Sequence, residues 1–378
     1  MRIITGDCME ELQALEPESV HSCMTSPPYW NLRDYGHDDQ LGLEADSDDY
    51  VQNIADVMDE VKRVLRPDGS LWLNLGDTYD DKNLQQIPAR VALELQQRGW
   101  ILRNRVTWAK PNPMPQSVKD RLNDTTEAVF HFVPNREYWY DLDAIREPFS
   151  EMTERINRFE ETVGQKRSNQ NAPGNHDQSN GLHSGGKKYE KLHPAGKNPG
   201  DVFEVTTKPF PDAHFAVYPP ELCAKPIKAT AAPQVCVECG APYEREIERE
   251  TLTPDEIKTH FPDRCADVSS DRNDGYRHQI NHDEREDLRN KLDKATHAKG
   301  WRQTCDCDTD ATEAGIILDP FAGAGTTLLK AKELGRDAIG IELNPEYADM
   351  ARARIGLEPH NPANVREDKE QNGLEDFS

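Results

Sequence analysis

The chain has 378 residues, of which 69 are Asp or Glu and 45 are Lys or Arg, so its formal net charge is −24. No run approaches the roughly 18 consecutive apolar residues of a membrane-spanning helix. The N-terminal residues also lack the basic and apolar regions of an export signal. We therefore expect a cytoplasmic protein without a membrane partner.

The acidic charge bears on the partners that the protein can bind. Phosphate neutralisation needs basic surface, so an excess of acids argues against nucleic acid in ordinary salt. Abundant Asp and Glu, few Lys and low hydropathy are also typical of salt-loving archaea, and an ordinary acidic protein is the alternative. At molar salt the Debye length is only about 3 Å, so the charge does not exclude nucleic acid.

The first block of the chain, residues 1–149, alternates strand-like and helix-like runs, and this alternation predicts an α/β sheet. The apolar spacing predicts strands at 2–5, 20–25, 70–75, 101–109 and 127–133, and helices at 9–15, 50–65 and 87–98.

Two polar segments interrupt the rest of the chain. Residues 151–200 offer few anchors for a core and read as a linker. Residues 201–230 are expected to be ordered, whereas 244–300 form a charged insertion that is either disordered or weakly helical. The pattern at 315–356 predicts a strand, a Gly-rich turn, a helix, a second strand and a second helix.

The Gly-rich turn predicts a nucleoside site. An apolar strand ends at Asp319, and the turn Gly323-Ala324-Gly325 leads into the next helix. A second strand carries Glu342 at its end, where an acid can bind ribose hydroxyls. Leu328 stands where a third glycine would be, which disfavours a dinucleotide. The alternative is a simple strand–helix turn.

A stiff loop, Ser26-Pro27-Pro28-Tyr29-Trp30, follows the strand at 20–25. Two prolines fix φ and remove N–H donors, so the loop presents carbonyl oxygens. The Ser26 hydroxyl, the Pro27 carbonyl and the aromatic rings suit an exocyclic amino group held in plane and stacked on a ring. The alternative is a Pro-Pro turn with incidental aromatic residues.

Together the two motifs resemble those of the DNA amino-methyltransferases that use S-adenosylmethionine. The order, with Ser-Pro-Pro-Tyr before Asp-Pro-Phe-x-Gly-x-Gly, resembles the circularly permuted beta group. The resemblance covers roughly residues 1–149, 201–243 and 301–356. It implies a Rossmann-like class I methyltransferase sheet that is circularly permuted.

The resemblance also implies a division of the chain. Residues 1–149 would be the catalytic half and 315–356 the cofactor-binding half. Residues 150–314 would be an insertion for target recognition, with a cofactor-closing segment at 201–230. Residues 357–378 are expected to form a disordered acidic tail.

The same resemblance implies roles for single residues. Glu342 would bind the ribose hydroxyls, Asp7 would meet the adenine amino group, and Phe215 would close over the methionine end. The reaction centre would be formed by Ser26, Pro27, Pro28 and Tyr29. The methionine part of the cofactor would be surrounded by Asp319, Phe321, Gly323, Gly325 and Thr326.

The implied reaction is direct transfer of a methyl group to N4 of a flipped cytosine in double-stranded DNA. Methylation at C5 needs a cysteine nucleophile, commonly in a Pro-Cys pair, and the chain contains no such pair. Ser26 in the first motif position, rather than Asp or Asn, favours cytosine N4 in this family. Adenine N6 is the alternative, and a zinc-stabilised DNA-binding protein is the non-enzymatic one.

Partners and target follow from the resemblance only. We expect a monomer or homodimer, with a cognate restriction enzyme or none. Haloarchaeal members often recognise CTAG, which is the expected target. A basic, aromatic stretch at 103–121 predicts contacts to phosphate or base. The predicted DNA-contacting residues are Trp30, Arg103, Arg105, Lys110, Lys119 and Arg121.

The cysteines predict one metal site. Cys236 and Cys239 form a zinc-knuckle-like turn, and Cys305 and Cys307 can complete a four-thiolate site for a structural Zn²⁺. Cys265 is a possible substitute ligand, and four free thiols are the alternative.

Overall fold

The computed structural model describes residues 1–32, 40–148, 196–207, 217–249 and 296–358, without the side chains of 247–249 and 296–299. The chain divides into two compact units. The first comprises Met1–Ala144, Gly200–Glu244 and Gln303–Ser378, and the second Ile145–Pro199 and Arg245–Arg302. In the described part of the chain, no helix is long and apolar enough to cross a membrane.

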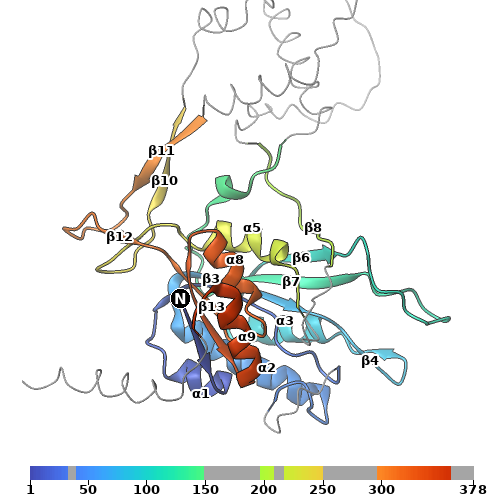
Figure 1. The fold of residues 1–378 in the computed structure, drawn as a ribbon. Coiled ribbons are helices and arrows are strands. Elements are labelled where there is room, and N and C mark those ends of the chain that lie inside the picture. The colour runs from blue at the N-terminus through green and yellow to red at the C-terminus, as the bar shows by residue number, and fades with distance from the viewer. Residues whose placement is uncertain (33–39, 149–195, 208–216, 250–295, 359–378) are drawn as a thin grey trace, which may run out of the picture. The chain divides into compact units, whose positions relative to one another are not determined.

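One mixed sheet of eight strands organises the first unit (Figure 1). Its strands are β1 (Arg2–Thr5), β2 (Val20–Thr25), β3 (Leu65–Leu75), β6 (Ile101–Ala109), β7 (Thr126–Val133), β8 (Val202–Glu204), β13 (Ile316–Asp319) and β14 (Asp337–Glu342). They lie in the order β1-β14-β13-β2-β3-β7-β6-β8. The first five in this order are parallel, and β7 is antiparallel to both of its neighbours. The predicted α/β sheet is confirmed.

Helices cover both faces of this sheet. They are α1 (Cys8–Gln13), α2 (Ser47–Val64), α3 (Ile87–Gln97), α5 (Pro220–Thr230), α8 (Thr326–Glu333) and α9 (Pro345–Ile355). Buried side chains of α1, α2 and α3 belong to one apolar cluster, and those of α5, α8 and α9 belong to a second. Figure 1 shows α5, α8 and α9 together over the strands. The result is a three-layer α/β/α unit.

The longest helix shows why these residues fold as they do. In α2 the buried side chains recur at Ile54, Met58 and Val61, the spacing of one helical face. The Asp46 carboxylate caps the helix N-terminus by accepting a 2.6 Å hydrogen bond from the Asp48 N–H.

The strand β3 starts earlier than the sequence predicts. We expect a strand from Ser70, after a helix stop at Pro67-Asp68-Gly69, but β3 already begins at Leu65. Its pairing with β2 shifts register between Val20 and Ser22. Leu65 to Ser70 spans five positions on β3 against two on β2, so an irregular stretch of the pairing contains the turn-forming residues.

The first and last strands of the described chain are neighbours. β1 pairs with β14 in parallel, and Thr5 lies opposite Glu342. Helix α9, which follows β14, packs on β1: the Arg352 guanidinium donates 2.9 Å hydrogen bonds to the Ile3 carbonyl and the Thr5 hydroxyl. The first strand of the described chain and the helix that follows its last strand therefore lie together at the β1 edge of the sheet.

The second unit contains a two-stranded sheet of β10 (Glu244–Arg249) and β11 (Thr296–Arg302). The Arg245 guanidinium lies 4.7 Å from the centre of the Trp301 ring. The expectation of disorder or weak helix for 244–300 is therefore wrong at both ends of that segment.

Candidate active site

Polar residues gather where the parallel strands end. The carboxyl ends of β1, β14, β13, β2 and β3 share one edge of the sheet, and ligands of α/β sheets bind at that edge. Because β7 is antiparallel to β3, the start of β7 lies at the same edge. Residues that follow β2 and β3 and the beginning of β7 therefore share this edge of the sheet.

A cavity of about 790 Å³ lies at this edge. Its volume falls within the roughly 300–1,000 Å³ of small-molecule sites. Its walls include Asp7, Phe321, Gly323, Thr326 and Glu342 from the predicted cofactor residues. They also include all four residues of the predicted reaction centre, Ser26, Pro27, Pro28 and Tyr29.

The Glu342 carboxylate is held by backbone donors on both oxygens. The N–H of Gly323 donates to Oε2 at 2.7 Å, and the N–H of Asn344 donates to Oε1 at 2.9 Å. Gly323 has a φ of 51°, in the left-handed region that favours glycine. The acid is therefore fixed in place at the cavity wall.

Asp7 has a structural task as well as a place on the cavity wall. Its Oδ1 accepts hydrogen bonds from the N–H groups of Met9 at 2.9 Å and Glu10 at 3.1 Å, which caps α1. A carboxylate has about four acceptor positions, so capping leaves acceptor capacity for a ligand.

Two of the predicted cofactor residues do not line the cavity. Asp319 is 1% exposed, and its carboxylate accepts hydrogen bonds from the Thr25 hydroxyl at 2.7 Å and the Tyr218 hydroxyl at 3.2 Å. Burial raises the pKa of Asp319. At Gly325 a Cβ would meet the Ala351 Cβ at 2.9 Å, so this glycine lets α8 and α9 approach. Both residues therefore support the glycine turn without lining the cavity.

Phe215 lies outside the described residues. The predicted closing segment at 201–230 is described at 201–207 and from Val217 onward, and Thr207, Val217 and Tyr218 line the cavity. Tyr218 also shares a hydrogen bond with the Thr327 hydroxyl of α8. The segment therefore contributes to the cavity through residues that the sequence does not single out.

The Tyr29 hydroxyl is the centre of a polar network. It donates to Oε2 of Glu127 at 2.7 Å, and it accepts hydrogen bonds from the Ser26 hydroxyl at 3.3 Å and from Nδ2 of Asn74 at 2.7 Å. Burial, and next the Glu127 carboxylate, raises the pKa of Tyr29 well above its ordinary value. The phenol therefore stays protonated, and its position is fixed from three sides.

Asn74 and Glu127 belong to the candidate site, and sequence reasoning missed both of them. Asn74 Nδ2 also donates to Ser26 Oγ at 3.2 Å and to Glu127 Oε2 at 3.0 Å. Lys110, expected to contact DNA, forms an ion pair with Glu127 at the cavity. The available signal is a polar residue beside an apolar run, as at Asn74 in Leu71-Trp72-Leu73-Asn74-Leu75 and at Glu127 just before Ala128-Val129-Phe130.

Gly76, just after β3, makes room for the Tyr29 ring. A Cβ at this position would lie 2.4 Å from Cε2 of Tyr29. The ring therefore packs against the backbone at Gly76, and Tyr29 also lines the cavity.

The structure does not support Trp30 as a DNA contact. Its ring is 6% exposed within the core, and its Nε1 donates a 2.9 Å hydrogen bond to the Glu44 carbonyl. An aromatic residue after a catalytic loop motif can serve packing as well as substrate, and here it serves packing.

The remaining predicted DNA contacts are on the surface in two places. Arg103 and Arg105 are exposed on β6 itself, and Arg103 donates to the Tyr138 hydroxyl at 2.9 Å. Lys119 is exposed on the loop that joins β6 to β7. Arg121, on that loop, lies 4.0 Å from the Tyr79 ring centre and forms an ion pair with Asp124. Their contact with DNA stays a prediction.

The four predicted metal ligands converge outside the cavity. The sulfur atoms of Cys236, Cys239, Cys305 and Cys307 all lie within 4.8 Å of one another. Cys265 lies outside the described residues.

The comparisons with known proteins agree on one family. The family model described as DNA methylase (N6_N4_Mtase) matches residues 20–237 and 310–353. Type II methyltransferase M.SfiI of Streptomyces fimbriatus is 33% identical over 390 residues, which cover 91% of this chain and 88% of that protein. Type II methyltransferase M.SmaI of Serratia marcescens is 28% identical over 383 residues, which cover 94% and 90%.

A solved structure shares the fold. The cytosine-N4-specific PvuII DNA methyltransferase matches 98% of this chain and 91% of its own with a TM-score of 0.51. The two sequences are 16% identical, so this likeness concerns the fold alone.

Proposed function

Because the chain belongs to the DNA methylase family of amino-methyltransferases, we propose that it transfers a methyl group from S-adenosylmethionine to the exocyclic N4 of cytosine in duplex DNA. The observation that carries the proposal is one cavity that joins two sites. Glu342 and Gly323 line it together with Ser26 and Tyr29, so a cofactor and a base can meet there.

The cofactor end of the cavity fits a nucleoside with hydroxyl and amino groups. Glu342 is an acceptor held by two backbone N–H groups, which suits the ribose hydroxyls. Asp7 offers a second acceptor for the adenine amino group. Gly323 and its neighbours have no bulky side chains, so the backbone can approach the ligand. When bound, S-adenosylmethionine supplies an electrophilic sulfonium methyl group.

The base end suits an amino group that must offer its lone pair. Ser26 Oγ and the Pro27 carbonyl are acceptors for amino protons, and hydrogen bonds of this kind help the nitrogen act as a nucleophile. Such transfer needs alignment rather than a covalent intermediate. The target amino group is inside the base stack of a duplex, so the base has to be flipped into the cavity.

The choice of cytosine rests on Ser26 in the first motif position. Adenine N6 is the second candidate. A DNA-binding protein without catalysis would have no need for the fixed Tyr29 hydroxyl and Glu342 carboxylate in one cavity, and both are present.

We also propose that the sheet is circularly permuted. The parallel pairing of β1 with β14 and the packing of α9 on β1 support it, because α9 has the position of a crossover helix between these strands. In an unpermuted chain α9 would lead directly into β1. Here β1 is the first strand, and the catalytic half precedes the cofactor half.

High-salt adaptation is a further part of the proposal. It is supported by the net charge of −24. Activity on duplex DNA should therefore persist in molar KCl, where exposed acids repel phosphate weakly. The CTAG target and contacts through Arg103, Arg105, Lys119 and Arg121 stay predictions that the same assays address.

The deciding experiment is product analysis. Purified protein is incubated with duplex DNA and radiolabelled S-adenosylmethionine in high salt, and the DNA is digested to nucleosides. N4-methylcytosine is expected. If N6-methyladenine is found instead, the protein methylates adenine N6. DNA binding without any methylated nucleoside would support the non-enzymatic alternative. Long-read sequencing of the methylated DNA then identifies the recognition sequence.

A matched pair of variants ties the product to this cavity. Ser26→Ala should greatly reduce product, whereas Leu93→Ala should not, because Leu93 is 59% exposed on α3 and absent from the cavity wall.

A further inference from the structure

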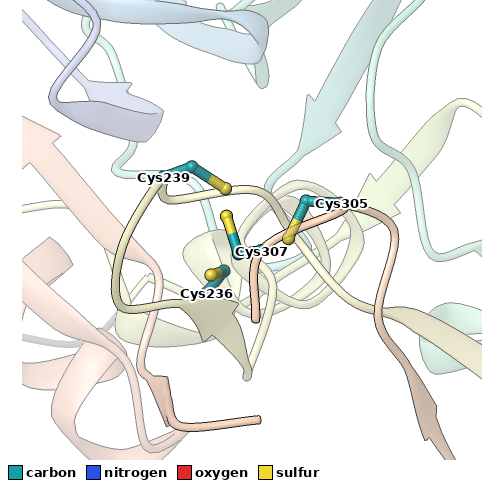
Figure 2. A group of neighbouring side chains, drawn as sticks. All are labelled: Cys236, Cys239, Cys305 and Cys307. Atoms are coloured by element: carbon teal, nitrogen blue, oxygen red, sulfur yellow. The ribbon is translucent and has the colours of Figure 1, made fainter. Parts of the chain in front are cut away.

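Four cysteines from two distant segments of the first unit point toward one centre. Figure 2 shows the sulfur atoms of Cys236, Cys239, Cys305 and Cys307 turned toward each other. They lie within 4.8 Å of one another, and the four thiols are free. Cys239 and Cys305 are separated by 66 positions in sequence. The fold, rather than local sequence alone, therefore builds the cluster.

We infer that this cluster binds one Zn²⁺ ion with four thiolate ligands, and that the ion fastens both ends of the intervening segment to the sheet. A tetrahedral site with Zn–S bonds of about 2.3 Å requires sulfur atoms roughly 3.8 Å apart, which is compatible with four sulfur atoms that all lie within 4.8 Å of one another. An iron–sulfur cluster contains several metal atoms and needs its sulfur ligands further apart. The site does not depend on the proposed methyl transfer.

The surroundings support the thiolates in the manner of a built metal site. The side-chain amide of Gln303 donates to Cys305 Sγ at 3.3 Å and to the Cys307 carbonyl at 2.9 Å. Such outer contacts orient metal ligands. Gly240, with a φ of 67°, closes the first pair of ligands into a turn, and its N–H donates to the Cys236 carbonyl at 2.8 Å. That geometry favours glycine.

The metal-binding turn is bonded to the sheet at two points. The Arg66 guanidinium in β3 donates to the Cys239 carbonyl at 2.9 Å. The Ile316 N–H at the start of β13 donates to Nδ1 of His21 at 3.0 Å. Nε2 of His21 therefore carries the ring proton and donates to the Gly240 carbonyl, 3.0 Å away.

These contacts define the role of the ion. His21 is in β2 and Ile316 begins the strand that leads to the cofactor turn, so the metal-binding turn is connected to two central strands. None of the four cysteines lines the cavity. The ion is therefore structural.

Metal analysis of the full-length protein tests the assignment. Protein purified without chelator should hold about one zinc per chain. Titration of the wild-type protein with an organomercurial should release that zinc as four thiols react. Protein without zinc, or with iron in its place, would overturn the assignment.

Variants separate a metal site from four incidental thiols. Cys239→Ser should lose the zinc and lower the melting temperature; Cys239 is exposed, so the change itself disturbs little packing. Asp306→Asn, an exposed position between two of the ligands, should keep the zinc. If Cys239→Ser does not fold, chelator treatment of the wild-type protein replaces it: a melting temperature that stays unchanged after zinc removal would contradict the structural role.

Discussion

The backbone N–H of Gly323 donates a 2.7 Å hydrogen bond to the Glu342 carboxylate. The glycine turn after β13 and the acid at the end of β14 thus form one unit, which a ligand would meet as a single surface. The same contact fixes the acid without consuming all of its acceptor positions.

Replacing Glu342 tests this surface. Glu342→Ala should weaken S-adenosylmethionine binding by about 2–3 kcal/mol, because a charge-assisted contact to the ribose hydroxyls is lost. That corresponds to roughly 30- to 150-fold in the dissociation constant measured by calorimetry. Glu346→Ala is the matched control, since Glu346 is an exposed acid on the neighbouring helix α9. If both variants are folded and bind S-adenosylmethionine with equal affinity, Glu342 does not contact the cofactor.

Asp7 combines a helix cap with a predicted adenine contact, and two substitutions separate these tasks. Asn caps helices about as well as Asp, so Asp7→Asn should keep the melting temperature while it weakens cofactor binding. Asp7→Ala should also lose about 1 kcal/mol of unfolding free energy. Calorimetry and denaturant unfolding on the two variants measure the two effects. Full cofactor affinity in Asp7→Asn would show that Asp7 only caps α1.

Ser26 is expected to act on the base and not on the cofactor. Ser26→Ala should lower the single-turnover rate of methyl transfer in high salt, because an acceptor for the amino protons is lost. Its S-adenosylmethionine affinity should match that of the wild-type protein. A wild-type transfer rate would exclude Ser26 from the reaction centre.

The close approach of Gly76 and Tyr29 predicts non-additive substitutions. Gly76→Ala should displace the Tyr29 ring, because the new Cβ would lie 2.4 Å from it. Tyr29→Ala removes stacking worth roughly 1–3 kcal/mol per base, so it should slow transfer to duplex more than to mismatched DNA. The double variant should be no slower than Tyr29→Ala alone. If the rate losses of the two single variants add fully in the double variant, Gly76→Ala does not act through the Tyr29 ring.

His131 predicts a pH dependence of stability. Burial, and next the charge of Arg103, lowers its pKa to about 3, whereas the unfolded value is about 6.5. As the pH drops below 6.5, His131 binds a proton in the unfolded chain but stays neutral in the folded protein. The free energy of unfolding therefore falls. Between pH 7 and pH 5 the loss should be about 2 kcal/mol.

The control for this effect is His131→Phe, measured by denaturant unfolding at constant salt. Phenylalanine can keep the stack on Trp72, where the ring centres are 4.2 Å apart, but it loses the 3.1 Å hydrogen bond to the Ser70 hydroxyl. The variant should be less stable at pH 7 and less sensitive to pH. An equally steep loss in the variant would assign the pH dependence to other groups.

The sequence by itself determined most strands of the sheet and the two motifs, but not β8 (Val202–Glu204) or the early start of β3 at Leu65. Strands such as Val20–Thr25 and Ile101–Ala109 are predicted with the bounds that the structure has, because apolar runs between turn residues are a local signal. The places of Ser26 and Glu342 after strands are local as well. Both motifs lie at one edge of the sheet because the strands that precede them, β2 and β13, pair in parallel.

Only the tertiary structure decided which side chains meet. Glu127 reaches the site because β7 runs antiparallel to β3, a pairing between segments about 50 residues apart that no local pattern contains. Trp30 belongs to the core and Asp319 is buried behind the loop, although both are next to motif residues. Motifs record the order of residues along the chain, whereas packing decides whether a side chain faces the cavity or the core.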